Sequence, residues 1–278
     1  MSKNAIFLSL DKLFVNNALL CLLSIQKNFK EHPDIIICHT NLGEDEKKLL
    51  CSCCENITFI ENNLKNEDVW PIMSHLKNTD PRVFYARFLL WKDERFNKYE
   101  NILHLDCDTL VLQNLDELLS YDQFFIVQEW YDGNDQIFFD YKDPQLIKML
   151  DEDWIHLWKH SGNAWVFLLP KAYRTSNFYE EILNIKQRYE KYIKRADQSI
   201  INLWCYKHWW DVSENYSYNY QHRLINDKTD FSTIKIVHFN WISGKYRNEC
   251  MNYFLENYKA WAENYYSFYT QIMSNDGK

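Results

Sequence analysis

The sequence is poor in glycine and proline, with only five of each among 278 residues. So few turn-forming residues exclude a low-complexity linker, and the absence of a self-similar period excludes a repeat architecture. Hydrophobic residues make up 46% of the chain and aromatic residues 17%, which is enough to build a sizeable core. We therefore expect one globular domain over residues 1–247, followed by a C-terminal extension over residues 248–278.

Long apolar runs are missing as well. The apolar stretch near the N-terminus is interrupted by Asp11 and Lys12 before it reaches the length of a signal peptide or a membrane span. Eight cysteines lie mostly inside apolar segments, which is typical of small buried side chains in a reducing compartment. The sequence thus predicts a cytoplasmic protein without an integral membrane segment.

A paired cysteine motif is also lacking. The segment "CSCC" contributes Cys51, Cys53 and Cys54, but no second CxxC and no histidine pair has metal-ligand spacing. Half a zinc site is therefore the weaker interpretation of this segment, and small buried side chains are the stronger one.

The chain contains no basic block that would neutralise a phosphate backbone. Its 31 basic and 39 acidic residues give a net charge of -8, which argues against nucleic acid as a partner. An acidic protein that handles an anionic small molecule has to concentrate a few cations locally or recruit a metal ion.

What the sequence does contain is an alternation of apolar strands and amphipathic helices. Strands are expected over 5–10, 35–39 and 57–60, with helices over 15–28 and within 43–54, so the opening predicts a parallel sheet covered by helices. The later expected elements are a helix over 81–96, a strand over 101–105, a helix over 114–119, strands over 124–128 and 163–170, helices over 177–195 and from 196 onward, and a strand over 234–240.

The segment "ILHLDCDTLV" (102–111) ends an apolar strand on two acids, Asp106 and Asp108. In open α/β sheets ligands bind at the carboxyl ends of strands. Along an extended backbone the two side chains point to the same side, where a shared hard cation removes their repulsion. The pair therefore indicates Mg²⁺ or Mn²⁺. In the alternative interpretation, one aspartate caps the following turn and the other is solvated.

A haloacid dehalogenase-type phosphatase also has a DxD motif after a strand. Its pattern has Thr or Val two positions after the second Asp, where this chain has Leu110. The motif also lies more than 100 residues into the chain, far from the usual N-terminal position. The phosphatase is therefore the weaker alternative.

Four segments together resemble glycosyltransferase family 8, the GT-A group that includes glycogenin and bacterial galactosyltransferases. In chain order they are "YARFLLW" (85–91), "YENILHLDCDTLVLQNLDELL" (99–119), "GNAWVF" (162–167) and "ADQSIIN" (196–202). The resemblance spans roughly residues 5–245. It implies an α/β GT-A fold, a Rossmann-like mixed sheet between helices, with a helical, aromatic-rich C-terminal extension.

The resemblance also implies a function. A metal-dependent enzyme of this family would move a sugar from a nucleotide-sugar, most often a UDP-sugar, to a hydroxyl of a glycan or protein acceptor, with retention of configuration. Mn²⁺ or Mg²⁺ would be bound by Asp106, Asp108 and His238. The donor would be contacted by Asp11, Arg87, Gly244 and Lys245, and the catalytic residues lining the sugar would be Asn163, Asp197 and Gln198. Whether Asp197 or Gln198 acts as a nucleophile or stabilises an oxocarbenium-like species stays open.

The chain departs from the family pattern at two points. Gly244 is six residues after His238 and adjacent to Lys245, whereas the family has His-x-x-Gly-x-x-Lys. Trp165 stands where a small glycine is expected, which either narrows the sugar site or indicates a different donor. These departures keep one alternative open, a catalytically inactive sugar-binding or scaffold protein with this fold.

Aromatic residues are dense in 154–160 and 203–223, where they either stack on an acceptor glycan or pack in the core. The segment 251–270 is equally aromatic. Because it lacks the Lys/Arg-rich face of a membrane-surface helix, we expect it to pack on the domain or to form a homodimer.

Overall fold

The fold is given by a computed structural model. It describes residues 3–30, 32–54, 56–65, 80–129, 137–157, 160–208, 210, 212–218, 220–221 and 229–239. The expected C-terminal extension (248–278), including the segment 251–270 that was expected to pack on the domain or to form a homodimer, lies outside the described residues, as do Gly244 and Lys245. The domain boundary at residue 247 therefore stays a prediction.

A six-stranded mixed sheet forms the centre of the molecule, in the order β3-β2-β1-β4-β7-β6. Strands β1 to β4 run parallel, β7 is antiparallel to β4, and β6 is antiparallel to β7. This arrangement confirms the expected α/β mixed sheet. The strands are β1 (Asn4–Asp11), β2 (Asp34–Thr40), β3 (Ile57–Glu61), β4 (Asn101–Leu105), β6 (Phe125–Gln128) and β7 (Gly162–Pro170).

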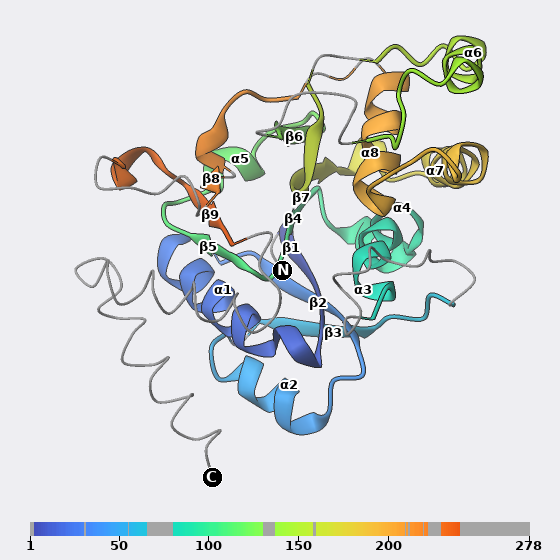
Figure 1. The fold of residues 1–278 in the computed structure, drawn as a ribbon. Coiled ribbons are helices and arrows are strands. Elements are labelled where there is room, and N and C mark those ends of the chain that lie inside the picture. Colours follow the sequence, from blue (N-terminus) through green and yellow to red (C-terminus); the bar gives the residue numbers. More distant parts are fainter. Residues whose placement is uncertain are drawn as a thin grey trace.

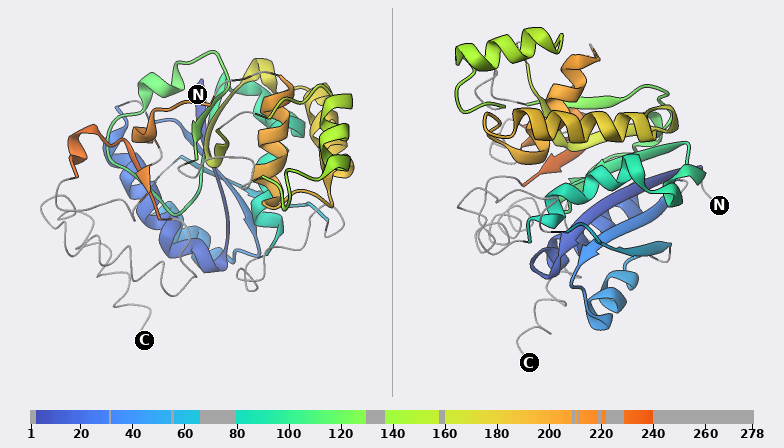
Figure 2. Two further views of the ribbon diagram at one scale, coloured as in Figure 1. Left: turned by 45° about the horizontal axis from the view of Figure 1, so that its top comes forward. Right: turned by 90° about the vertical axis from the view of Figure 1, so that its right-hand side faces the viewer.

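Helices cover both faces of this sheet (Figures 1 and 2). On one face lie α1 (Val15–Asn28) and α2 (Glu44–Cys51), and on the other lie α3 (Arg82–Tyr85), α4 (Leu89–Lys92), α7 (Ser176–Tyr189) and α8 (Ala196–Lys207). Two further helices add to the same two layers: α5 (Asp116–Leu119) packs its leucines into the cluster with α1, and α6 (Pro144–Glu152) packs its leucines into the cluster with α8.

Strand β1 shows why the sheet is buried between the two helical layers. Alternate side chains of a strand point to opposite faces, and here Phe7 joins the apolar cluster that contains Trp204 of α8. Its neighbour Leu8 joins the opposite cluster with Leu22 of α1. Both faces are therefore apolar, as expected for the parallel part of a sheet covered on two sides.

A second, smaller sheet pairs β5 (Thr109–Val111), β9 (Ile236–His238) and β8 (Tyr220–Gln221) in the order β5-β9-β8. The strand expected over 234–240 is confirmed as β9, but it is shorter and belongs to this second sheet. In Figure 1 the small sheet lies next to α1, beside the carboxyl end of β4.

The single helix expected over 81–96 is wrong. The chain instead forms α3, a 3₁₀ turn over Ala86–Phe88, α4, and a second 3₁₀ turn over Glu94–Lys98. The first tightening occurs at Arg87, whose guanidinium contacts groups far away in the sequence. The break after α4 follows from Asp93, whose carboxylate accepts a hydrogen bond from the amide of Arg95 and so caps the next turn.

The helix expected over 177–195 ends earlier than predicted, at Tyr189. Beyond it the chain leaves the helix because its backbone pairs with another segment: the carbonyl of Tyr192 accepts from the amide of Phe139, and the amide of Lys194 donates to the carbonyl of Ile137.

Within the described ranges, no helix is long and apolar enough to cross a membrane. The seven cysteines in those ranges form no disulfide with one another. Cys51 is exposed while Cys53 and Cys54 are buried, and the group of potential metal ligands found in the described part of the chain does not include them.

Candidate metal centre and the side chains around it

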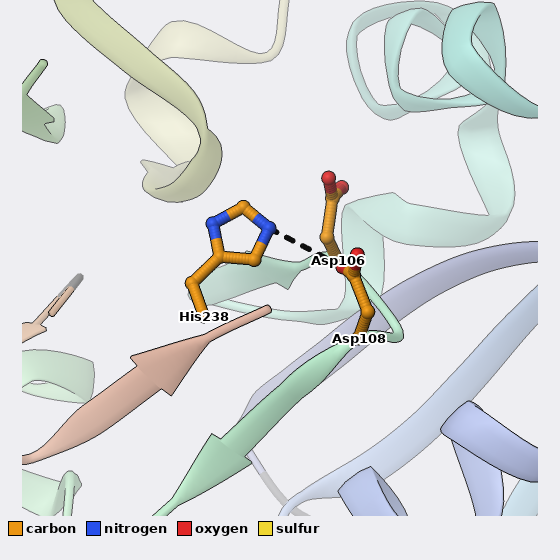
Figure 3. Close-up of side chains that lie close together, drawn as sticks. All are labelled: Asp106, Asp108 and His238. Carbon is orange, nitrogen blue, oxygen red and sulfur yellow. Dashed lines mark ion pairs between the residues drawn. The ribbon is translucent and has the colours of Figure 1, made fainter. Parts of the chain in front are cut away.

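Three potential metal ligands converge beside the carboxyl end of β4: Asp106, Asp108 and His238. Asp106 directly follows β4, Asp108 lies in the turn before β5, and His238 is the last residue of β9. Their ligand atoms all lie within 4.8 Å of one another, and Figure 3 shows the imidazole turned toward the two carboxylates. Two carboxylates and one imidazole suit Mn²⁺ or Mg²⁺.

Strand pairing explains why His238 meets Asp108. Antiparallel β5 and β9 place Thr109 opposite His238, and the amide of Phe239 donates to the carbonyl of Asp108 over 3.0 Å. This register brings Nε2 of His238 to 3.2 Å from Oδ1 of Asp108. A shift of one residue would turn the imidazole to the other face of the small sheet.

The sequence predicted that the two aspartates lie on an extended backbone, and this is wrong. Asp106 precedes a turn and Asp108 lies in it, and the hydroxyl of Thr109 donates across this turn to the carbonyl of Asp106 over 2.8 Å. The turn, and not the alternation of a strand, brings the two carboxylates together.

One oxygen of Asp106 is held by two neighbours. The NH2 nitrogen of Arg87 lies 3.0 Å from Oδ1, and Nε2 of His104 lies 3.2 Å from the same atom. Oδ2 is therefore the oxygen that can bind a cation without breaking either contact. Hydrogen bonds of this kind fix the orientation of a ligand carboxylate in advance.

His104 is fully buried, and its ring lies between Phe7 and Phe167. Burial, together with the nearby charge of Arg87, lowers the pKa of His104 to about 4. The ring is consequently neutral at pH 7, and since a carboxylate can only accept, Nε2 carries the proton and donates to Asp106.

Arg87 connects the metal centre to α8. Its side chain is buried, its Nε lies 3.1 Å from Oδ2 of Asp197, and its guanidinium also donates to the carbonyl of Ala164. Burial raises the pKa of Asp197, and the charge of Arg87 opposes this rise. The expected contact of Arg87 with a donor stays a prediction, because the contacts shown by the structure are all internal.

Gln198, the next residue on α8, has an unusual environment. It is buried, yet among the described residues neither Nε2 nor Oε1 has a hydrogen-bond partner. An unpaired buried amide is costly, so Gln198 is a candidate to hydrogen-bond a polar ligand.

Asn202 fixes the first turn of α8 against the start of β7. Its amide accepts from the N–H of Gly162 over 2.6 Å and donates to the carbonyls of Gly162 and Gln198, both over 2.8 Å. These three hydrogen bonds determine where Asp197 and Gln198 lie relative to β7.

Asn163 is also buried, but both polar atoms of its side-chain amide form hydrogen bonds. Nδ2 donates to Glu129 over 2.9 Å, and Oδ1 accepts from the amide of Trp165 over 3.0 Å. Glu129 lies in turn 3.6 Å from a guanidinium nitrogen of Arg195. The role of Asn163 at a sugar stays a prediction.

Asp11 is the last residue of β1. Its two carboxylate oxygens accept from the amides of Leu13 and Asp80, over 2.9 and 3.1 Å. These bonds join β1 to the segment that precedes α3. Its expected place beside a nucleotide base and ribose stays a prediction.

Sequence reasoning missed His104, Glu129 and Asn202. A signal existed for His104, which is the one polar side chain in the apolar run 102–105 and therefore needs a buried partner. Glu129 and Asn202 gave no comparable signal, since their partners lie 34 and 40 residues away.

The aromatic segments divide between the two interpretations. Trp204 is fully buried, with its ring centroid 5.3 Å from those of Trp91 and Phe124, so it packs in the core. Trp154, in contrast, is 76% exposed and is free to stack on another molecule.

Comparison with known proteins gives one family. The family described as Glycosyl transferase family 8 matches residues 5–245. No curated protein sequence matches the chain.

Solved structures similar to this chain include the galactosyltransferase LgtC in complex with donor and acceptor sugar analogs. It is 15% identical with a TM-score of 0.66, over 94% of this chain and 95% of that one. The glycosyltransferase GlyE of Streptococcus pneumoniae is 16% identical (TM-score 0.58; 96% and 64% covered). Mouse xyloside xylosyltransferase 1 is also 16% identical (TM-score 0.53; 86% and 98% covered). At these identities the likeness shows the fold alone.

Proposed function

Because the chain belongs to glycosyl transferase family 8 and has the GT-A fold of these transferases, we propose that it moves a sugar from a UDP-sugar to a hydroxyl acceptor with a divalent metal. The observation that carries this proposal is the convergence of Asp106, Asp108 and His238 within 4.8 Å. Asp106 and Asp108 come from the segment between β4 and β5, and His238 comes from the end of β9, so only the folded chain brings the three together.

The donor set fits Mn²⁺ or Mg²⁺, with Oδ2 of Asp106, a carboxylate oxygen of Asp108 and Nε2 of His238 as the ligand atoms. The chemistry that a bound ion supplies is Lewis-acid stabilisation of the departing nucleoside diphosphate. The chain's own contribution is to keep the ligands in place, through the bonds of Arg87 and His104 to Asp106.

On the sugar side, we assign the main role to Gln198. Its unpaired amide can donate to and accept from sugar hydroxyls or the ring oxygen, which would satisfy both of its polar atoms. A further LgtC structure is described as an active-site mutant in which glutamate replaces a glutamine, and this supports the assignment. Asp197 lies beside Gln198 with its charge balanced by Arg87.

We further infer transfer with retention, in keeping with the family resemblance. A carboxylate and an amide on the first turn of α8 are the groups available to stabilise positive charge that develops on the reacting carbon. The acceptor is a hydroxyl of a glycan or a protein, and the exposed Trp154 is a surface on which a sugar ring can stack.

Donor hydrolysis tests the proposal. The protein is incubated with UDP-glucose, UDP-galactose or UDP-N-acetylglucosamine and Mn²⁺, and released UDP is measured. We expect release with at least one donor, its loss in EDTA and its return with excess Mn²⁺. Gln198→Ala should lower the rate about 100-fold, the usual effect of removing one group that stabilises the transition state.

The rival interpretation predicts a different result. If folded, metal-binding protein releases no UDP from a wide panel of nucleotide-sugars, the chain is a non-catalytic sugar-binding or scaffold protein. The phosphatase alternative no longer applies, because the family match covers residues 5–245, including the DxD motif.

A further inference from the structure

Trp165, the residue that departs from the family's small glycine, lies against the histidine of the metal centre. The centroids of its indole ring and of the His238 imidazole are 4.5 Å apart, and the two ring planes meet at 83°. The proposed function makes no use of this contact.

The backbone of Trp165 is fixed on both sides. Its amide donates to the side chain of Asn163 over 3.0 Å, and its carbonyl accepts from the amide of Asp106 over 2.9 Å. The half-buried indole therefore extends from a backbone position that is hydrogen-bonded to the backbone amide of Asp106. Trp165 is thus bonded to Asp106 through its own backbone carbonyl and contacts His238 through its indole ring.

The orientation of the imidazole matters because a metal binds along the nitrogen lone pair, which lies in the plane of the ring. Rotation of His238 about its Cβ–Cγ bond would swing Nε2 away from Asp108, which now lies 3.2 Å from it. A perpendicular indole packed against the ring opposes this rotation. Edge-to-face contacts between aromatic rings are favourable in addition to the area they bury.

We propose that Trp165 is a positioning residue that holds the His238 imidazole with Nε2 toward the two aspartates, so that the metal centre is ordered before an ion binds. This inference rests on the proposed function, since it takes Asp106, Asp108 and His238 as metal ligands. Groups that orient a metal-binding histidine typically contribute 10- to 100-fold to metal affinity.

Mn²⁺ binding, followed by the electron paramagnetic resonance signal of the free ion, tests the proposal without reference to activity. Trp165→Leu fills much of the space but lacks a ring, and we expect it to weaken Mn²⁺ binding about 10-fold. Trp165→Phe keeps an aromatic ring and should stay within about twofold of the wild type. Trp154→Phe, at a position that is 76% exposed, is the matched control and should bind as the wild type does.

Tryptophan fluorescence gives a second measurement. Paramagnetic Mn²⁺ quenches a nearby indole, so part of the wild-type emission should fall during a Mn²⁺ titration. This quenched part should disappear in Trp165→Phe and persist in Trp154→Phe. A structural role for Trp165 remote from the metal would leave the quenching unchanged.

The outcomes distinguish the metal centre itself from the positioning role of Trp165. If Asp108→Asn abolishes Mn²⁺ binding while Trp165→Leu binds as tightly as the wild type, the metal centre is correct and the role of Trp165 is wrong. If Asp108→Asn binds Mn²⁺ unchanged, both are wrong. If Trp165→Leu fails to fold by circular dichroism, the quenching comparison decides, and quenching that survives in Trp165→Phe overturns the proposal.

Discussion

Asp106 depends on two buried side chains of opposite character, the cation Arg87 and the neutral His104. A buried guanidinium is costly unless paired, and here it is paired with both Asp106 and Asp197. His104 avoids the same cost by remaining uncharged. The result is a carboxylate oriented by two donors, with one oxygen left for a cation.

The low pKa of His104 predicts how metal-free stability changes with pH. The unfolded imidazole takes up a proton near pH 6.5, whereas the buried ring resists protonation down to about pH 4. Acidification through this window therefore favours the unfolded state, and the stability from His104 is present above pH 6.5 and lost toward pH 4. His104→Gln keeps an N–H donor but does not titrate.

Urea unfolding in EDTA at pH 7 and pH 4.5 measures the effect. The free energy of unfolding should drop by roughly 2 kcal/mol more in the wild type than in His104→Gln, because each pKa unit corresponds to about 1.4 kcal/mol. Equal drops in the two proteins would show that His104 titrates as an ordinary surface histidine.

At the residue level, the sequence predicted the three residues of the candidate metal centre but not the side chains that support them. Asp106 and Asp108 come after an apolar strand, a position that is visible in the sequence, whereas His238 was predicted from the family resemblance. Glu129 and Asn202 act through partners that only the fold brings near. Asn163 and Arg87 were predicted from the resemblance, yet their many internal contacts depend on that same fold.

At the element scale, α1 shows where sequence alone suffices. Its helical spacing of apolar residues gave the same bounds, residues 15–28, that the structure has. The expected helix over 81–96 failed because the 3₁₀ turn over Ala86–Phe88 coincides with contacts from Arg87 to Ala164 and Asp197, more than 70 residues away. The local spacing of apolar residues cannot reveal contacts between residues so far apart in the sequence.

Helix α1 also supports β5, the strand that follows Asp108. In the antiparallel ladder with β9, the amide of Val111 faces away from the partner strand, and it donates instead to the hydroxyl of Ser24 over 2.9 Å. Asn28 adds a bond from its side chain to the carbonyl of Val111, also over 2.9 Å.

Ser24→Ala should lower the free energy of unfolding by about 1 to 3 kcal/mol, because it leaves the buried amide of Val111 without a partner. Ser52→Ala removes a hydroxyl that donates to the carbonyl of Leu49 at an exposed helix end, and should cost about 0.5 kcal/mol or less. Urea unfolding curves compare the two, and equal losses would rule out an anchoring role for Ser24.

At the scale of the whole molecule, the charge distribution supports the proposal that the site works with a divalent metal. The chain carries a net charge of -8, and the charge of Arg87 is already balanced by Asp106 and Asp197. A diphosphate brought next to Asp106 and Asp108 would meet two carboxylates. A divalent cation bound between the two carboxylates and the diphosphate would neutralise the carboxylates and place a positive charge next to the phosphates.

The overall architecture was the part that sequence predicted best. Alternating strands and helices indicated the parallel half of the sheet, and the ordered motifs indicated the GT-A fold. The second sheet was not foreseen, because β5 and β8 are only three and two residues long. Segments this short give no period that a sequence pattern can detect.

Calorimetric titration of UDP in the presence of Mn²⁺ tests the central claim most directly. The wild type and Asp122→Asn, which changes an exposed acid, should bind UDP with Mn²⁺ and lose that binding in EDTA. Asp108→Asn should weaken Mn²⁺-dependent UDP binding by about 100-fold or more while its thermal unfolding stays cooperative. Unchanged UDP binding by Asp108→Asn would contradict a metal–diphosphate site at the end of β4.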